Sequence, residues 1–225
     1  MNEITTIGLD LAKYVFPLHG IDASGEVALR RQLRRRQLLA FFKTLPPCLV
    51  GVEACATSHY WARELQALGH AVRIMPANYV KAYVKRNKTD AADAQAICEA
   101  VTRPTMRFVG VKSAEQQSLM MLHRSRSLLV PQRTMLVNAI RAHMAELSIV
   151  APVGRRGVAA FHAIIADPAD EHVPALARHC LESLVATLIT VEREVAASER
   201  RIHAWHRSSE ASRRLETIPG IGPII

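Results

Sequence analysis

Residues 4–11 read ITTIGLDL, a short apolar run rich in β-branched residues, which is the pattern of a strand buried inside a sheet. Residues 48–54, CLVGVEA, repeat that pattern. Each run carries an acid near its end, Asp10 in the first and Glu53 in the second. A buried charge is costly unless it is paired or binds a metal, and ligands of α/β proteins bind at strand ends. The two acids are therefore the first candidates for a functional site.

The segments around these two runs alternate between strand and helix patterns. Pro46-Pro47 stops one helix, Gly69 ends another, and residues 22–25 (DASG) have the composition of a hairpin turn. With the two apolar runs, the order of the segments predicts an α/β domain over residues 1–110. The further elements that we expect are strands at residues 14–21, 26–33 and 71–75, and helices at residues 35–45, 58–68 and 90–102.

From Ser113 onward the strand patterns disappear, so we expect an all-α region over residues 111–208. Ser113 and Gln116 form a capping box for one or two helices over residues 113–147. Pro131 should kink or break that segment, and residues 151–157 have the composition of a loop.

A second helical stretch, from Ala175 to about Trp205, carries a heptad pattern. Its apolar residues recur at alternating steps of three and four, with only Ser198 out of place. A seam this regular usually meets another helix, so we favour a self-associating or hairpin coiled coil over a helix that packs only on its own domain. The seam residues are Leu181, Leu184, Leu188, Val191, Val195, Ile202 and Trp205.

Two more acids, Asp90 and Asp93, follow Thr89, the expected N-cap of the helix over residues 90–102. Their spacing of three directs both side chains from one face of the first turn. Each acid alone has an ordinary explanation, such as the helix dipole for Asp90 and Asp93, a hydrogen-bonded turn for Asp10 or an arginine partner for Glu53. Four acids gathered together repel one another, and one or two Mg²⁺ ions, or Mn²⁺ in their place, would relieve this. Two strand acids and helix acids are the layout of ribonuclease-H-like nucleases, where paired metal ions assist phosphodiester displacement.

The composition is strongly basic, with 29 Lys and Arg against 20 Asp and Glu, a net charge of +9 and a pI near 9.9. This balance indicates a polyanionic partner, either nucleic acid or an anionic membrane surface. A basic run is more often a solvated face, but one group here precedes the expected metal site, where phosphates need neutralisation. Aromatic residues make up only 5%, so we expect backbone contacts rather than base stacking. The candidate nucleic-acid-binding residues are Arg34, Arg35, Arg36, Lys81, Lys85, Arg86, Lys88, Arg124, Arg126 and Arg133.

The sequence argues against a membrane protein or a secreted one. It has no run of about 18 uncharged apolar residues, and its N-terminus lacks the basic start and apolar stretch of a signal peptide. Cys48, Cys55, Cys98 and Cys180 show no zinc or disulfide spacing. We expect them to be small buried apolar residues in a reducing cytoplasm.

Three stretches resemble the DEDD-type insertion-sequence transposases: GLDLAK (8–13), GVEACATSHYWAREL (51–65) and, most specifically, YVKAYVKRNKTDAADAQAI (79–97). LETIPGIGP (215–223) resembles the start of that family's second domain. The resemblance implies a RuvC-like, ribonuclease-H-like catalytic domain at 1–110, a helical linker or coiled-coil oligomerisation region at 111–208, and the start of a C-terminal transposase domain at 209–225. The four metal-binding catalytic positions that it implies are Asp10, Glu53, Asp90 and Asp93.

The resemblance also implies an activity, that of a transposase or recombinase in the bacterial nucleoid. Members of the family cleave and join DNA, are thought to combine the acids with a serine of the C-terminal domain, and are thought to be guided by a structured RNA that the element encodes. They assemble into dimers or tetramers. No serine of this sequence lies in a matching motif, so we expect a piece of a longer protein, with little strand exchange by residues 1–225 alone.

Three other functions would use the same features. A stand-alone nuclease similar to Holliday-junction resolvases would use the same acids, but the Pro-Gly-Ile-Gly-Pro tail argues against it. A kinase or ATPase of the actin and sugar-kinase type would use GLDLAK as a phosphate loop, but the sequence has no second glycine-rich loop after a strand. A non-catalytic nucleic-acid-binding protein would bind without divalent metal, and substitution of Asp10 would cost it stability rather than activity.

Overall fold

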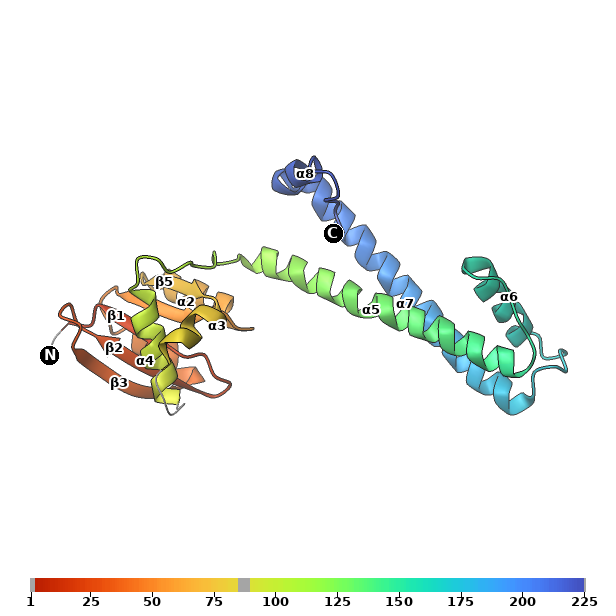
Figure 1. The fold of residues 1–225 in the computed structure, drawn as a ribbon, viewed down its shortest axis with the longest axis horizontal. Helices are drawn as coiled ribbons and strands as arrows, with labels where there is room; N and C mark the ends of the chain where they lie inside the picture. The colour runs from red at the N-terminus through yellow and green to blue at the C-terminus, as the bar shows by residue number, and fades with distance from the viewer. Residues whose placement is uncertain (1–2, 85–89, 225) are drawn as a thin grey trace. The chain divides into compact units, whose positions relative to one another are not determined.

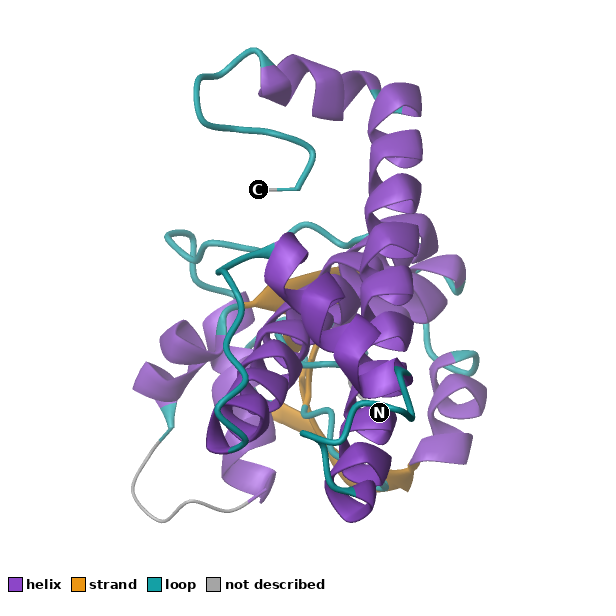
Figure 2. Cartoon of the chain, turned by 90° about the vertical axis from the view of Figure 1, so that its right-hand side faces the viewer, coloured by secondary structure: helices purple, strands orange, loops and turns teal. Residues whose placement is uncertain are grey.

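The chain forms two compact units in a computed structural model, residues Met1–Gln116 and residues Gln117–Ile225. The structure describes residues 3–84 and 90–224. Within these ranges the strands belong to the first unit, and the second unit consists of helices and loops (Figure 1, Figure 2). The expected fold class, an α/β ribonuclease-H-like domain followed by an all-α region, is confirmed.

The strands of the first unit lie within two residues of the ranges expected from the sequence, and β1 differs most, being two residues shorter at each end. Two short helical segments after the last strand, α3 and η2, were not expected. In chain order the elements are β1 (Thr6–Leu9), β2 (Val15–Ile21), β3 (Val27–Arg34), η1 (Arg35–Gln37), α1 (Leu38–Phe42), β4 (Leu49–Glu53), α2 (Ser58–Ala67), β5 (Ala71–Met75), α3 (Ala77–Val80), η2 (Lys81–Tyr83) and α4 (Asp90–Val101).

The sheet has the strand order β3-β2-β1-β4-β5. β2 runs antiparallel to β1 and β3, whereas β1, β4 and β5 run parallel to one another. The turn between β2 and β3 forms where the sequence predicts it, because Oδ1 of Asp22 accepts hydrogen bonds from the amides of Ser24 and Glu26 at 2.9 and 3.0 Å. Since β1, β4 and β5 are parallel, their carboxyl ends meet at one edge of the sheet.

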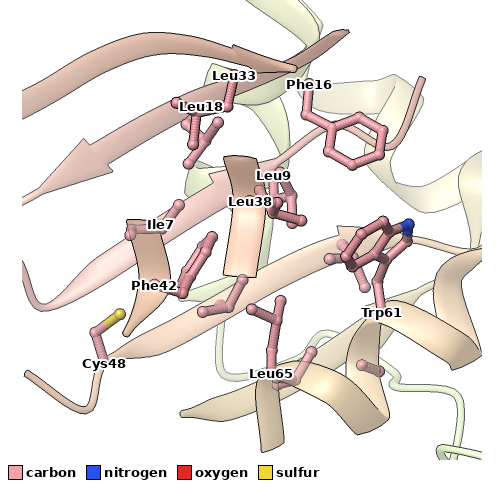
Figure 3. Close-up of a cluster of buried hydrophobic side chains, with 14 of the residues drawn as sticks. Ile7, Leu9, Phe16, Leu18, Leu33, Leu38, Phe42, Cys48, Trp61 and Leu65 are labelled. Atoms are coloured by element: carbon pink, nitrogen blue, oxygen red, sulfur yellow. The ribbon is translucent and has the colours of Figure 1, made fainter. Parts of the chain in front are cut away.

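One face of the sheet is covered by α1 and α2. Side chains of a strand alternate between its two faces, so Ile7 and Leu9 of β1 point to the same side. Both are fully buried there, together with Phe42 of α1 and Leu65 of α2, as Figure 3 shows. This apolar cluster fixes the position of β1 from that side.

The other face is crossed by α4, which packs on β1, β2 and β4. Gly8 and Gly51 lie at the crossing and are paired in the parallel register of β1 and β4. A Cβ at Gly8 would lie against the carbonyl oxygen of Ala94 and 2.7 Å from Cβ of Cys98, and a Cβ at Gly51 would lie 2.8 Å from Cβ of Val101. The two glycines therefore allow the helix to approach the sheet closely.

The helices of the second part of the chain are α5 (Ala114–Glu146), α6 (Arg155–Ala166), α7 (Ala175–Ser208) and α8 (Glu210–Glu216). α5 and α7 run antiparallel in the second unit. Near one end of the pair, Nη2 of Arg126 on α5 lies 2.7 Å from Oε1 of Glu199 on α7. Toward the other end, Ile140 of α5 and Leu188 of α7 share an apolar cluster with Phe161 of α6.

Most of the seam predicted along α7 is buried. Leu184 is partly buried and packs against the apolar cluster, with Val185 beside it buried. One position is wrong, because His206 is buried where we expected Trp205. A helix with 3.6 residues per turn drifts from a strict heptad, so the next residue along turns inward. Ser198, expected to be out of place, is buried in the seam as well. The confirmed seam positions are Leu181, Leu184, Leu188, Val191, Val195 and Ile202.

Three expectations for the helical region need correction. α5 continues through Pro131, so the expected break is wrong. Pro131 is exposed, and α5 is packed on both sides of it, through Arg126 and through Ile140. α6 begins inside the segment expected to be a loop, and α8 was not expected. The capping box is confirmed, since the Ser113 amide donates to Gln116 Oε1 at 2.9 Å and the Gln116 amide to Ser113 Oγ at 3.0 Å.

The expectation that every cysteine is buried is also wrong. Cys48 and Cys98 are buried, whereas Cys55 and Cys180 are exposed, in the loop after β4 and on the outer face of α7. Burial raises the pKa of the Cys48 and Cys98 thiols to about 11. Among the described residues, no helix is both long and apolar enough to cross a bilayer.

Candidate functional site

Asp10 and Glu53 lie next to each other at the carboxyl edge of the sheet. Leu9 pairs with Val52 in the parallel register of β1 and β4, so the residues that follow them are Asp10 and Glu53. Gly8 and Gly51 face α4, and side chains two residues further along a strand point to the same face. Both acids are thus directed to the face of the sheet that α4 covers.

Hydrogen bonds beyond the strand ends hold this edge in place. The amide of Asp10 donates to the carbonyl of Pro17 at 3.1 Å, and the amide of Ala54 donates to the carbonyl of Met75 at 2.8 Å. The backbone that carries each acid is therefore fixed by a neighbouring strand rather than by a loose loop.

The crossing helix α4 contributes a third acid. Asp93 directly precedes Ala94, whose carbonyl oxygen lies over Gly8. Asp10, Glu53 and Asp93 line one pocket of about 640 Å³, and all three are half-buried. Asp90 is the first residue of α4, one helical turn before Asp93, and its side chain lies outside the described part of the chain.

The pocket is completed by residues that follow β5. Asn78 of α3 and the exposed Lys81 of η2 line it together with Ala77 and Val84. Lys81 was among the expected phosphate contacts, whereas Asn78 was not. Asp10 and Glu53 were predicted because ligands of α/β proteins bind at the carboxyl ends of strands. The same reasoning could have found Asn78, because β5 is the next parallel strand and Asn78 follows its end by three residues.

The pocket has the chemistry of a site for hard cations. Carboxylate oxygens are the ligands that Mg²⁺ and Mn²⁺ prefer in proteins, and Asn78 adds an amide oxygen. Lys81 places a cation at the same pocket, where it would favour an approaching phosphate. Within the described part of the chain, no three His, Cys, Asp or Glu side chains are close enough together to hold one ion.

The basic residues predicted to bind nucleic acid are distributed over both units. Arg34 and Arg36 are exposed at the end of β3 and in η1, while the guanidinium of Arg35 lies over the ring of Trp61 at 5.1 Å. Arg35 is therefore partly engaged in the fold. Lys85, Arg86 and Lys88 lie outside the described residues.

In the helical unit the three predicted arginines differ from one another. Arg124 is exposed on α5. Arg126 donates from Nε and Nη2 to Oε1 of Glu199, at 2.9 and 2.7 Å, which holds it in the α5–α7 pair. Arg133 lines a pocket of about 590 Å³ between α5, α6 and α7. Arg124 has the most open position for a phosphate contact of these three.

The strand order, the parallel central strands and the acids at their carboxyl edge define the class of protein as a ribonuclease-H-like α/β domain with a helical extension. Comparison with known families agrees. The profile of the DEDD transposases of the IS110 type, described as "Transposase", matches residues 7–149. The chain belongs to this DEDD transposase family.

Curated relatives match along almost all of the chain. The chain is 49% identical over 227 aligned residues to the "Probable family 20 transposase" of Pseudomonas aeruginosa, with 99% of this chain and 66% of that protein covered. It is 42% identical to a putative transposase of Sinorhizobium fredii, covering 100% and 57%. It is 37% identical to the transposase for insertion sequence element IS1328 of Yersinia enterocolitica, covering 100% and 66%. The chain thus spans 57% to 66% of the length of these relatives.

Proposed function

We propose that this chain carries the acidic half of the active site of an insertion-sequence transposase and acts in divalent-metal-dependent cleavage and joining of DNA. The observation that supports this most directly is the convergence of Asp10, Glu53 and Asp93 on one pocket at the carboxyl edge of the sheet. Three half-buried carboxylates in a chain of net charge +9 are explained by a role that needs negative charge at that point.

The roles of the residues follow from their positions. Among the described residues, Asp10, Glu53 and Asp93 do not lie close enough together to share one ion. Together with Asp90 they would hold one or two Mg²⁺ or Mn²⁺ ions through carboxylate oxygens, with each ion bound by part of the set. A bound divalent ion would supply charge stabilisation for the attacking and leaving oxygens of a phosphodiester. Lys81 would attract and orient the phosphate, and Asn78 would orient a ligand at the same pocket.

The experiment uses a 5′-labelled branched DNA, incubated with the chain and Mn²⁺ or with a chelator. Because the chain carries only the acidic half of the site, we expect at most weak nicking, without joining or strand exchange. This nicking should require the metal and fall by at least about 100-fold in Asp93→Asn, since the variant removes a charge and keeps the shape. Glu26→Gln, which changes an exposed acid in the β2–β3 turn, is the matched control and should leave nicking unchanged. DNA binding without metal-dependent nicking by the folded wild type would favour the non-catalytic nucleic-acid-binding alternative instead.

We propose DNA and a structured guide RNA as partners, in the bacterial cytoplasm at the nucleoid. Support comes from the basic composition and from membership of the transposase family. Fluorescence anisotropy with a DNA duplex and an RNA hairpin of equal charge distinguishes the two. Guidance by RNA predicts that the hairpin competes effectively at physiological salt, whereas equal weak binding of both would leave only a nonspecific electrostatic partner.

We also propose self-association into dimers or tetramers through the helical unit. Met121, Leu128 and Met135 lie on α5 at intervals of seven residues and are 62%, 63% and 68% exposed. Residues spaced by seven lie on one line of a helix, so they form an apolar stripe that a second copy would cover. Leu128→Glu should shift the sedimentation equilibrium toward monomer, while Ser127→Glu, beside the stripe, should not. Equal behaviour of the two variants would contradict this assembly.

A further inference from the structure

Three basic residues meet in the first unit, away from the acidic pocket. His59 and Arg63 lie one turn apart on the same face of α2, and Lys112 directly precedes Ser113, the first residue of the capping box of α5. The Lys112 amide lies 3.2 Å from Nδ1 of His59, and Lys112 Nζ lies 3.3 Å from Nε2 of the same ring. Nη1 of Arg63 donates to the Lys112 carbonyl at 2.6 Å. One lysine therefore approaches both nitrogens of one imidazole.

This arrangement contains more donors than acceptors. The Lys112 amide and the Lys112 ammonium are both obligatory donors, and a neutral imidazole offers only one acceptor nitrogen. The peptide that follows Lys112 is held at both ends, because the Ser113 amide donates to Gln116 and the Lys112 carbonyl accepts from Arg63, and this limits rotation of the backbone next to the Lys112 amide. If Nδ1 accepts from the amide, the ring proton lies on Nε2 and faces the ammonium group. Two N–H donors then converge on one point, 3.3 Å apart.

The positive charge around His59 also favours binding of an anion. Burial, then Lys112, then Arg63 lower the pKa of His59, so the ring is kept neutral beside two fixed cations. Among the described residues, Lys112 Nζ has no carboxylate partner. Converging donors with a cationic side chain that has no carboxylate partner among the described residues are the features of an anion site.

We propose that His59 and Lys112 bind one phosphate group of a nucleic-acid backbone, with Nε2–H and Nζ donating to its oxygens and Arg63 positioning Lys112. The partner class is taken from the proposed function, whereas the anion site itself rests on the donor arrangement alone. The site lies where the chain passes from the sheet domain into the long helix α5, and none of its three residues lines the acidic pocket. It would hold a nucleic acid by a contact separate from the reacting phosphodiester.

The first test titrates inorganic phosphate into the whole chain labelled with ¹⁵N-histidine and follows the His59 ring signals by long-range proton–nitrogen correlation. We expect a saturable shift, an Nε2–H tautomer and a rise in the pKa of His59 on phosphate binding, because an anion offsets the effect of Lys112 and Arg63. Lys112→Gln should abolish the phosphate response, and Lys43→Gln, at an exposed lysine after α1, should keep it. A wild-type His59 that does not respond to phosphate would overturn the proposal.

The second test measures binding of a DNA duplex and of an RNA hairpin over a series of salt concentrations. The logarithm of the binding constant falls linearly with the logarithm of the salt concentration, and loss of one phosphate contact makes this slope less steep by about one. We expect this decrease for Lys112→Gln but not for Lys43→Gln, whereas His59→Leu, which removes a neutral donor, should weaken binding at every salt concentration without changing the slope. Thermal melts confirm that each variant is folded. A decrease seen with only one of the two probes identifies that nucleic acid as the source of the phosphate. Equal slopes for Lys112→Gln and Lys43→Gln with both probes would refute the nucleic-acid contact.

These tests separate the inference from the proposed function. Asp93→Asn should lose metal-dependent nicking while keeping the phosphate response of His59. Lys112→Gln should lose the phosphate response while keeping the acids intact. Failure of nicking with a normal phosphate response would reject the catalytic proposal alone, and the reverse result would reject the anion site alone.

Discussion

Replacing Gly8 by alanine tests the packing that brings α4 over the strand ends. The new Cβ would lie 2.7 Å from Cβ of Cys98 and against the carbonyl oxygen of Ala94. Ordinary carbon–carbon contacts are about 3.5–4.0 Å, so the overlap is roughly 1 Å, and the backbone of α4 cannot rotate away as a side chain could. Overpacking of a core costs about 1–3 kcal/mol, and we expect the upper end here, about 3 kcal/mol. At about 2–4 °C per kcal/mol, this lowers Tm by roughly 6–12 °C.

The assay is thermal unfolding followed by circular dichroism and calorimetry, with two further glycines as a graded series. A Cβ at Gly51 would lie 2.8 Å from Cβ of Val101, whereas a Cβ at Gly8 meets backbone atoms of α4 at shorter range, so we expect a smaller loss for Gly51→Ala than for Gly8→Ala. Gly110→Ala meets nothing within 4 Å and should change stability by less than about 0.5 kcal/mol. A Gly8→Ala variant as stable as Gly110→Ala would refute the close packing of α4 on β1.

Two further predictions concern the thiols and the helix pair. Burial raises the pKa of Cys48 to about 11, so its thiol stays protonated at pH 8. Iodoacetamide should therefore label Cys48 far more slowly than the exposed Cys55, and mass spectrometry measures the two rates. Similar labelling rates would contradict the burial of Cys48. The partly exposed ion pair of Arg126 and Glu199 should give a coupling energy of about 0.5–1 kcal/mol in a double-mutant cycle of thermal unfolding, and zero coupling would argue against the antiparallel α5–α7 pair.

The strand-end acids could be found from the sequence because two local patterns determine them. Apolar runs rich in β-branched residues mark β1 and β4, and parallel neighbours necessarily place Asp10 beside Glu53. Asp93 required one further assumption, that α4 crosses β1 near its end. Gly8 and Gly51 carry this information, but only once the structure shows which helix lies over them.

The helices α6 and α8 and the contact between His59 and Lys112 have weak sequence patterns or none. α6 was missed because its Arg-Arg-Gly start resembles a loop, although Phe161 and Ile165, spaced by four, are both buried. α8 buries no residue among its seven, so it has no apolar pattern to detect. The contact of His59 with Lys112 joins residues 53 positions apart, and no local pattern connects them.

The most direct test of the central claim is isothermal calorimetry of Mn²⁺ binding to the chain with a DNA duplex present, comparing wild type, Asp10→Asn and Glu26→Gln. We predict saturable metal binding by wild type and Glu26→Gln above the background of DNA alone, and its loss in Asp10→Asn while the melting curve stays cooperative. Equal Mn²⁺ binding by Asp10→Asn and Glu26→Gln would contradict the claim that the acids at the carboxyl edge of the sheet hold a divalent ion.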